Sequence, residues 1–159
     1  QVKKYLGPQF TPRYDATDGC NMPTISLTLK ELAKIYSLFA AEKNEDWIWS
    51  TMTSHPNIIG GQGRLDSTII ASCAGEVLAK EGADGLLGLS LQNKDYPDGL
   101  GVIIKLAHGM DLKAMNYIAQ SLLKCLGYNI PKLYPLEKQT THISPEVVPP
   151  KYQSMISNN

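Results

Sequence analysis

Three short apolar segments in the middle of the chain constrain its fold more than any other feature. They span residues 76–80, 86–91 and 100–106. The connections between them end in Asp84-Gly85 and Asp98-Gly99, dipeptides that are typical of tight turns. A crossover between parallel strands needs about a dozen residues or more, and neither connection is that long. The sequence therefore predicts a three-stranded antiparallel meander.

Helices are predicted on both sides of this meander, because apolar residues there recur at helical spacing. Thr28 and Glu31 have the spacing of a capping box, in which each side chain accepts a hydrogen bond from the other residue's backbone N–H. Asp111 has the position of an N-cap, and Gly127 that of a helix terminator. The predicted helices span residues 28–42, 44–55, 66–75 and 111–127. The apolar face of the last helix needs a surface to cover, and the meander is the nearest one.

The predicted fold class is therefore α+β, an antiparallel sheet with packed helices, in a single domain of residues 1–135. The length of 159 residues fits one domain of about 100–200 residues. Scattered prolines and glycines predict an irregular lead-in through residue 25, with at most one short strand. Residues 136–159 are rich in Pro, Thr, Ser and Asn, which predicts a mobile tail. The chain starts at Gln1 without an initiator Met, so we expect it to be part of a longer polypeptide.

Charge and hydropathy exclude several classes of partner. Fifteen Lys and Arg residues balance fifteen Asp and Glu residues, which gives a formal net charge of zero. A protein that binds nucleic acid or an anionic membrane would need a basic excess. No apolar run reaches the ~20 residues that span a bilayer, and no segment has the pattern of a signal peptide. The odd number and wide spacing of Cys20, Cys73 and Cys125 argue against a disulfide framework and favour a reducing, cytoplasmic setting.

Common nucleotide-binding and metal-binding motifs are missing from the sequence. It contains neither a P-loop nor an HExxH motif, and its three histidines lack metal-ligand spacing. The glycine-rich loop 60–63 runs into Arg64 rather than into Gly-Lys-Ser, so a phosphate-binding role is not favoured. The simpler interpretation is a tight loop whose backbone passes close to another segment. Arg64 and Asp66 fit a local ion pair and a helix N-cap, with a role in a site as the alternative.

Two further places could carry chemistry. Asp18 and Cys20 flank one glycine in a loop, where a carboxylate and a thiol could orient each other or ligate a metal. The alternative is a turn-forming Asp beside a small buried hydrophobe. Lys80 ends an apolar strand two residues before Gly82, which suits a cleft where a substrate lies along the strand edge. The alternative for Lys80 is an edge-strand charge that prevents aggregation between sheets.

Together, these segments resemble the C-terminal half of the L-asparaginase II family of the Rhizobium type. The resemblance rests on Asp18-Gly19-Cys20, on His55-Pro56 followed by Gly63-Arg64-Leu65-Asp66, and on Lys80-Glu81-Gly82-Ala83-Asp84-Gly85. The order and spacing of these motifs agree over residues 15–127. That family is similar in fold to serine β-lactamases and penicillin-binding proteins. The resemblance therefore implies that this chain is part of a β-lactamase-like fold.

The resemblance also implies hydrolysis of the side-chain amide of L-asparagine to aspartate and ammonia. In such enzymes a serine of an S-x-x-K motif attacks the amide carbon, a neutral lysine takes its proton, and backbone donors hold the oxyanion. Lys80 matches the second catalytic lysine of the family, and Asp18 matches a carboxylate that orients the site. Arg64 and Gly82 are expected to bind substrate. Cys20 matches a ligand of a zinc ion whose other ligands must come from elsewhere.

Two departures from the family pattern affect this interpretation. The lysine strand continues as Lys80-Glu81-Gly82 instead of K-T-G, so Glu81 either faces away from the cleft or alters substrate recognition. S-x-x-K occurs only at residues 121–124, inside the last predicted helix, where we interpret it as structural. The nucleophile is therefore expected from an N-terminal half outside this sequence, as a separate chain or a missing segment.

Two other functions stay open at this point. The chain could be a non-catalytic binding or regulatory module that retained the cleft. It could also be a stand-alone α+β protein that dimerises through its exposed sheet edge. In the leading interpretation its partners are L-asparagine, the N-terminal half of the enzyme, and a second copy of the full enzyme in a homodimer.

Overall fold

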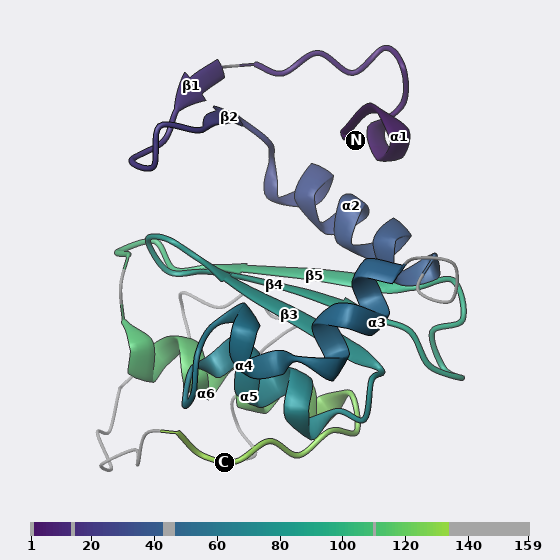
Figure 1. The fold of residues 1–159 in the computed structure, drawn as a ribbon, viewed down its shortest axis with the longest axis vertical. Coiled ribbons are helices and arrows are strands. Elements are labelled where there is room, and N and C mark those ends of the chain that lie inside the picture. Colours follow the sequence, from purple (N-terminus) through teal and green to yellow (C-terminus); the bar gives the residue numbers. More distant parts are fainter. Residues whose placement is uncertain (1, 14, 43–46, 110, 134–159) are drawn as a thin grey trace, which may run out of the picture.

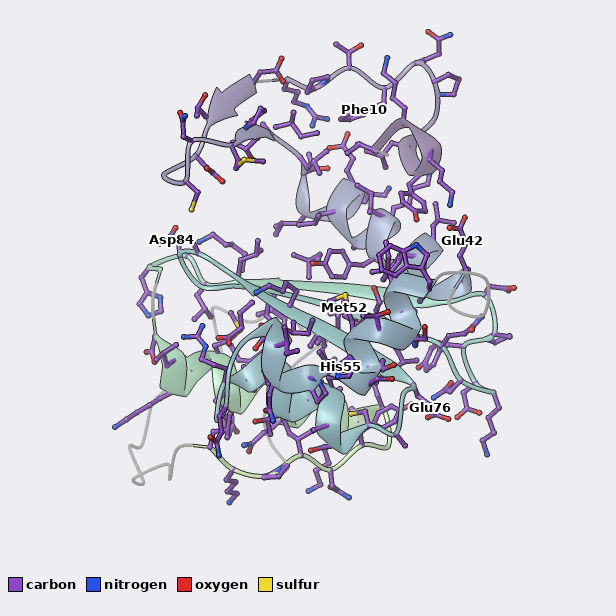
Figure 2. All side chains as sticks on the ribbon, in the orientation of Figure 1. Phe10, Glu42, Met52, His55, Glu76 and Asp84 are labelled. Carbon is purple, nitrogen blue, oxygen red and sulfur yellow. The ribbon has the colours of Figure 1, made fainter. Side chains whose placement is uncertain are left out.

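The predicted meander is present in the computed structural model, which describes residues 2–13, 15–42, 47–109 and 111–133. Its strands are β3 (Val77–Gly82), β4 (Leu86–Leu91) and β5 (Leu100–Lys105), paired antiparallel in that order (Figure 1). The register places Lys80 opposite Gly88. Asp84 lies at the tip of the first turn, where its φ is positive (Figure 2). The order leaves β3 at one edge of this sheet, as the sequence predicted.

Helices cover both faces of the sheet (Figure 1). On one face α2 (Leu29–Ala41) packs against β4 and β5. On the other face lie α5 (Leu65–Ser72) and α6 (Leu112–Cys125). The short helices α3 (Trp47–Ser54) and α4 (Pro56–Ile59) connect the two layers. This arrangement confirms the α+β class.

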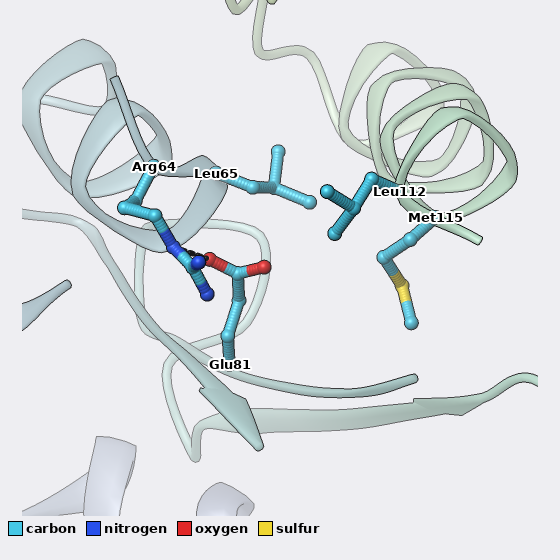
Figure 3. A pocket seen from close by; sticks show the side chains of 5 residues that line it. All are labelled: Arg64, Leu65, Glu81, Leu112 and Met115. Carbon is cyan, nitrogen blue, oxygen red and sulfur yellow. Dashed lines mark hydrogen bonds and ion pairs between the residues drawn. The ribbon is translucent and has the colours of Figure 1, made fainter. Parts of the chain in front are cut away.

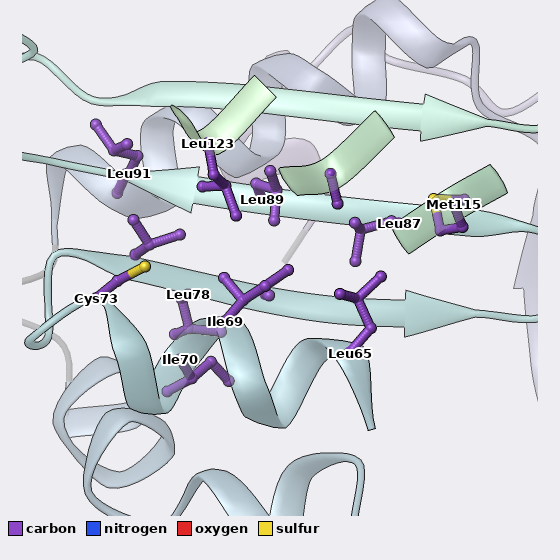
Figure 4. Packing of buried hydrophobic residues seen from close by; sticks show 14 of the residues in the cluster. Leu65, Ile69, Ile70, Cys73, Leu78, Leu87, Leu89, Leu91, Met115 and Leu123 are labelled. Carbon is purple, nitrogen blue, oxygen red and sulfur yellow. The ribbon is translucent and has the colours of Figure 1, made fainter. Parts of the chain in front are cut away.

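The hydrophobic core lies between β4 and the helices α5 and α6 (Figure 4). Leu87, Leu89 and Leu91 point toward this face, because side chains alternate along a strand. Their buried partners on the two helices are Leu65, Ile69, Met115, Ala119 and Leu123. Full burial of each leucine or isoleucine contributes about 1.5–3 kcal/mol. The last helix therefore covers the meander, as its apolar stripe predicted.

The predicted caps account for where the longer helices begin. Thr28 Oγ1 accepts a hydrogen bond from the Glu31 N–H at 3.2 Å, and the Glu31 carboxylate accepts one from the Thr28 N–H at 2.8 Å. Asp111 Oδ1 accepts from the Ala114 N–H at 2.8 Å and so caps α6. The start of the predicted helix 44–55 and the predicted tail 136–159 lie outside the described residues.

The N-terminal segment has more secondary structure than the sequence predicted. The helix α1 (Val2–Leu6) packs on α2. The Tyr5 hydroxyl donates a hydrogen bond at 3.2 Å to the carboxylate of Glu42, which follows the end of α2 (Figure 2). The strands β1 (Asp15–Thr17) and β2 (Pro23–Ile25) form an antiparallel hairpin, where at most one strand was expected. Strands of three residues are too short to show alternation, which explains why the sequence signal was weak.

Small residues on the sheet allow α2 to approach it closely. A Cβ added at Gly101 would lie 1.9 Å from the carbonyl oxygen of Ala33, and one at Gly88 would lie 2.4 Å from the Tyr36 ring. The Ser90 hydroxyl, on the same face, donates to the Tyr36 carbonyl oxygen at 2.8 Å. The backbone of α2 therefore rests directly on β4 and β5.

This close contact predicts that Gly101→Ala destabilises the protein. The new methyl group would meet backbone atoms, which cannot move aside as a side chain can, so we expect a loss of about 1–3 kcal/mol in the free energy of unfolding. Urea unfolding followed by circular dichroism measures it. The control is Gly19→Ala, whose Cβ meets nothing within 4 Å. Equal stability of the two variants would contradict the packing described above.

Candidate active site

A buried carboxylate, that of Asp66 in α5, joins this helix to the edge strand β3. The residue is 0% exposed. Its Oδ2 accepts a hydrogen bond from the Glu81 backbone N–H at 3.1 Å and lies 3.3 Å from Lys80 Nζ. Its Oδ1 accepts from the N–H of Ser67 at 2.9 Å. These donors matter because a buried charge without partners is strongly destabilising.

The Lys80 side chain is held at its tip, while much of it stays accessible. Its Nζ donates to the Glu81 carbonyl oxygen at 2.7 Å, in addition to its contact with Asp66. The side chain is 47% exposed. Both partners are hydrogen-bond acceptors, which suits an ammonium group with three N–H donors. Lys80 therefore presents a fixed cation at the edge of the sheet.

Lys80 also lines a hollow of about 260 Å³ between α2 and the sheet. The other lining residues come from α1, α2, α3, β3 and β4: Tyr5, Ile35, Tyr36, Phe39, Met52, Leu78 and Ser90. Burial raises the pKa of Tyr5 and of Tyr36, so both hydroxyls are neutral near pH 7. Among the described residues that line the hollow, Lys80 carries the only charge. The hollow is thus apolar, and Lys80 is the charged residue that borders it.

Glu81 points to the opposite face of the sheet from Lys80. Its carboxylate pairs with Arg64 Nε at 3.1 Å, beside Leu65 of α5 and Leu112 and Met115 of α6 (Figure 3). Neighbouring residues of a strand point to opposite faces, which accounts for the separation. The sequence left open whether Glu81 faces away from the cleft or alters substrate recognition. In the structure, Glu81 faces away from the hollow that Lys80 lines.

The two predicted substrate-binding residues, Arg64 and Gly82, flank this region. Arg64 is the N-cap residue of α5, and its guanidinium pairs with Glu81 of β3, seventeen residues away. The ion pair thus joins two elements and is not the local one that the sequence predicted. Asp66, which was a candidate N-cap, instead lies inside the helix and turns inward. Gly82 ends β3, where an added Cβ would lie 3.0 Å from Leu86 Cδ2. Substrate binding by Arg64 and Gly82 stays a prediction.

Asp18 and Cys20 lie in the turn of the β1–β2 hairpin. Asp18 Oδ1 accepts hydrogen bonds from the N–H groups of Cys20 and Met22, each at 2.9 Å, so the carboxylate shapes the turn. Cys20 is exposed rather than a buried hydrophobe. Within the described residues, no hydrogen bond or ion pair connects this turn to Lys80. The structure thus brings Lys80 and Asp66 together, pairs Arg64 with Glu81, and places Asp18 and Cys20 on a separate element.

A zinc site cannot be assembled from the part of the chain that the structure describes. A structural zinc site needs four ligands, and a catalytic one needs three protein ligands. No group of three or more His, Cys, Asp or Glu side chains with suitable geometry occurs in residues 2–13, 15–42, 47–109 and 111–133. Cys20 could supply one thiolate, so zinc binding would require ligands from other residues. We derive no chemical step through a metal.

The S-x-x-K string lies on the outer surface of α6. Ser121 and Lys124 are both exposed, whereas Leu123 between them is buried in the core. Neither Ser121 nor Lys124 lines the hollow beside Lys80. This placement agrees with the structural interpretation of residues 121–124.

Sequence reasoning missed the contact between Asp66 and Lys80. A signal for it existed, because Asp66 falls on the same helical stripe as Ile69, Ile70 and Cys73, all of which are buried. An acidic residue on an apolar stripe is expected to be buried and paired. The interpretation as an N-cap was favoured because Asp is common at that position.

The environments of the three cysteines predict different reactivities. Burial raises the pKa of the Cys73 thiol to about 11, so its thiolate fraction at pH 8 is about one in a thousand. Cys20 and Cys125 are exposed. We expect a thiol-reactive dye to label these two quickly in the native protein and Cys73 only after unfolding. Mass mapping of the labelled peptides measures this, with Cys20→Ser as the control. Fast native labelling of Cys73 would show that its site is open.

Comparisons with known proteins identify the family. No helix among the described residues is long and apolar enough to cross a membrane. A search of curated proteins found no match. The family model for L-asparaginase II, in contrast, matches residues 1–148, which include the hairpin turn, the Arg64–Asp66 segment and Lys80. Because this match covers most of the sequence, the chain belongs to the L-asparaginase II family.

Proposed function

We propose that this chain is part of an L-asparagine amidohydrolase, which converts L-asparagine and water to L-aspartate and ammonia. Membership of the L-asparaginase II family supports this class of hydrolase. The observation that carries the proposal is the position of Lys80. It holds the place of the second catalytic lysine in the family pattern, its ammonium is fixed at a sheet edge, and it lines an accessible hollow.

Lys80 acts in this proposal as a fixed cation rather than as the base. Two of its three N–H groups point to acceptors, the Asp66 carboxylate and the Glu81 carbonyl oxygen. The third is free to meet the α-carboxylate of the substrate or a second serine. A cation held before the substrate arrives stabilises developing negative charge without reorganisation in the transition state.

The serine nucleophile comes, in this proposal, from residues outside this sequence. The chemistry requires a serine and a lysine of an S-x-x-K motif facing the same cleft as Lys80. The only such string here is on the exposed surface of α6. The polypeptide that supplies the nucleophile would complete the cleft beside the β3 edge, on a β-lactamase-like scaffold.

In this proposal, the hairpin residues Asp18 and Cys20 form a second wall of the cleft. Asp18 fixes the turn that presents Cys20, and a zinc ion would need further ligands from the same outside residues as the serine. A homodimer of the full enzyme and a cytoplasmic location belong to the same proposal. Substrate hydrolysis tests the proposal most directly.

The first functional test is Lys80→Ala in the intact protein. We expect ammonia release from L-asparagine to fall by at least about a hundredfold in kcat, because the preorganised cation is lost. A coupled ammonia assay measures it. The matched control is Lys105→Ala, which removes a lysine of the same sheet that pairs with Asp84 at 3.1 Å.

The outcomes separate the candidate functions. Undiminished turnover in Lys80→Ala would remove Lys80 from the mechanism. No ammonia release by the unmodified intact protein would favour the non-catalytic binding module. Light scattering of this chain alone would reveal the stand-alone dimer through a doubled mass.

A second test concerns the S-x-x-K string of α6. Ser121→Ala in the intact protein should leave kcat and KM for L-asparagine unchanged, because Ser121 is exposed and does not line the hollow beside Lys80. Steady-state ammonia release measures both constants, and Ser157→Ala serves as a control at another serine. Loss of turnover in Ser121→Ala would mean that this chain carries its own nucleophile.

A further inference from the structure

We propose that Asp66 is the positioning residue for Lys80: its carboxylate holds the Lys80 ammonium in place. Gly60, which has no side chain, leaves the space that this carboxylate occupies. The proposal deepens the proposed function, on which its catalytic consequence rests. It assigns a purpose to two features of the sequence, the glycine-rich loop 60–63 and an acidic residue on an apolar helical stripe.

The first step is the set of contacts that meet at the carboxylate. Oδ2 of Asp66 lies within reach of both the Glu81 backbone N–H, at 3.1 Å, and Lys80 Nζ, at 3.3 Å. The backbone contact fixes the position of the strand edge relative to α5. The side-chain contact fixes the ammonium relative to that same edge. One carboxylate thus holds both the strand and the cation that the strand carries.

The second step is the close approach of Gly60. A Cβ added there would lie 1.9 Å from Asp66 Oδ1, too close for any other residue unless the carboxylate moved. The loop is held in place, since the Gly60 N–H donates to Ser67 Oγ at 3.2 Å and that hydroxyl donates to the Pro56 carbonyl oxygen at 2.8 Å. Glycine is therefore needed at this point for the carboxylate to keep its position.

The third step is energetic. Asp66 is fully buried, yet its partner Lys80 has a side chain that is 47% exposed. An ion pair that is partly open to solvent returns less energy than the burial of the carboxylate costs, so the pair with Lys80 is not explained by stability alone. The charge is better explained by what it does to Lys80. Because the tip of the Lys80 side chain is already held, its rotamer freedom is restricted before a substrate binds. Substrate binding therefore costs less conformational entropy.

Other charged and titratable groups near Lys80 do not provide this function. Glu81 lies on the other face of the sheet, where Arg64 neutralises it. Tyr5 and Tyr36 line the same hollow, and their hydroxyls are neutral near pH 7. Asp66 is thus the carboxylate that faces the Lys80 ammonium within the described residues.

The test is Asp66→Asn, compared with Asp84→Asn, in the intact protein. Asp84 pairs with Lys105 at 3.1 Å, a matched Lys–Asp contact elsewhere on the same sheet. Limited acetylation with acetic anhydride and peptide mapping reports each lysine separately. We expect Asp66→Asn to raise acetylation of Lys80 at least about threefold, because its ammonium loses the carboxylate. Asp84→Asn should raise acetylation of Lys105 and leave Lys80 unchanged.

Kinetics give the second readout. In Asp66→Asn, kcat/KM for L-asparagine should fall at least about tenfold. Asp84→Asn should leave kcat/KM unchanged. If the unmodified protein releases no ammonia, the proposed function fails, while the acetylation result still decides whether Asp66 positions Lys80.

Unchanged Lys80 acetylation in a folded Asp66→Asn variant overturns the proposal. If that variant does not fold, Gly60→Ala displaces the carboxylate without removing its charge and should also raise Lys80 acetylation; no rise overturns the proposal. The unmodified protein supplies a measurement that needs no variant. Lys80 should react more slowly than the exposed Lys113 of α6, and equal rates overturn the proposal.

Discussion

The contact between the buried Asp66 carboxylate and the edge of β3 determines how the candidate site is built. A sheet edge offers unpaired backbone N–H groups, and here the Glu81 N–H is paired by a side chain from α5 instead of by another strand. A buried hydrogen-bonding group that loses its partner costs about 1–3 kcal/mol, a substantial part of the 5–15 kcal/mol that stabilises a typical domain. The position of α5 and the position of the edge strand are therefore coupled.

The other end of β3 is anchored in the same manner. The Tyr128 hydroxyl donates to the Glu76 carboxylate at 2.6 Å and accepts from the Asn93 side-chain amide at 2.8 Å. Burial, with the Glu76 carboxylate beside it, raises the pKa of Tyr128 to about 12, so the hydroxyl keeps the proton that it donates. A hydrogen-bonded carboxylate thus holds each end of β3 in place. Because the strand is held at two points, Lys80 near its end has a defined position relative to α5 and α6.

Local patterns predicted the meander and the longer helices of this fold, whereas the contacts between elements needed the structure. The turns at Asp84 and Asp98, the capping box of Thr28 and the N-cap Asp111 depend on neighbours in sequence, so they could be recognised. The pairing of Asp66 with Lys80 spans fourteen residues and depends on how α5 docks. The loop 60–63 was expected to pass close to another segment, but the sequence did not reveal that the segment carries a buried carboxylate. Sequence spacing likewise could not show whether the loop of Asp18 and Cys20 contacts Lys80.

The side-chain alternation of β3 explains how an acidic residue can follow Lys80 without neutralising its ammonium. On the same face, a second carboxylate about 4 Å away would change the interaction energy of the ammonium by about 4 kcal/mol at an effective dielectric constant of 20. Alternation sends Glu81 to the face of α6, where Arg64 neutralises it. Lys80 then faces one buried carboxylate and one carbonyl oxygen, which together occupy two of its three N–H donors.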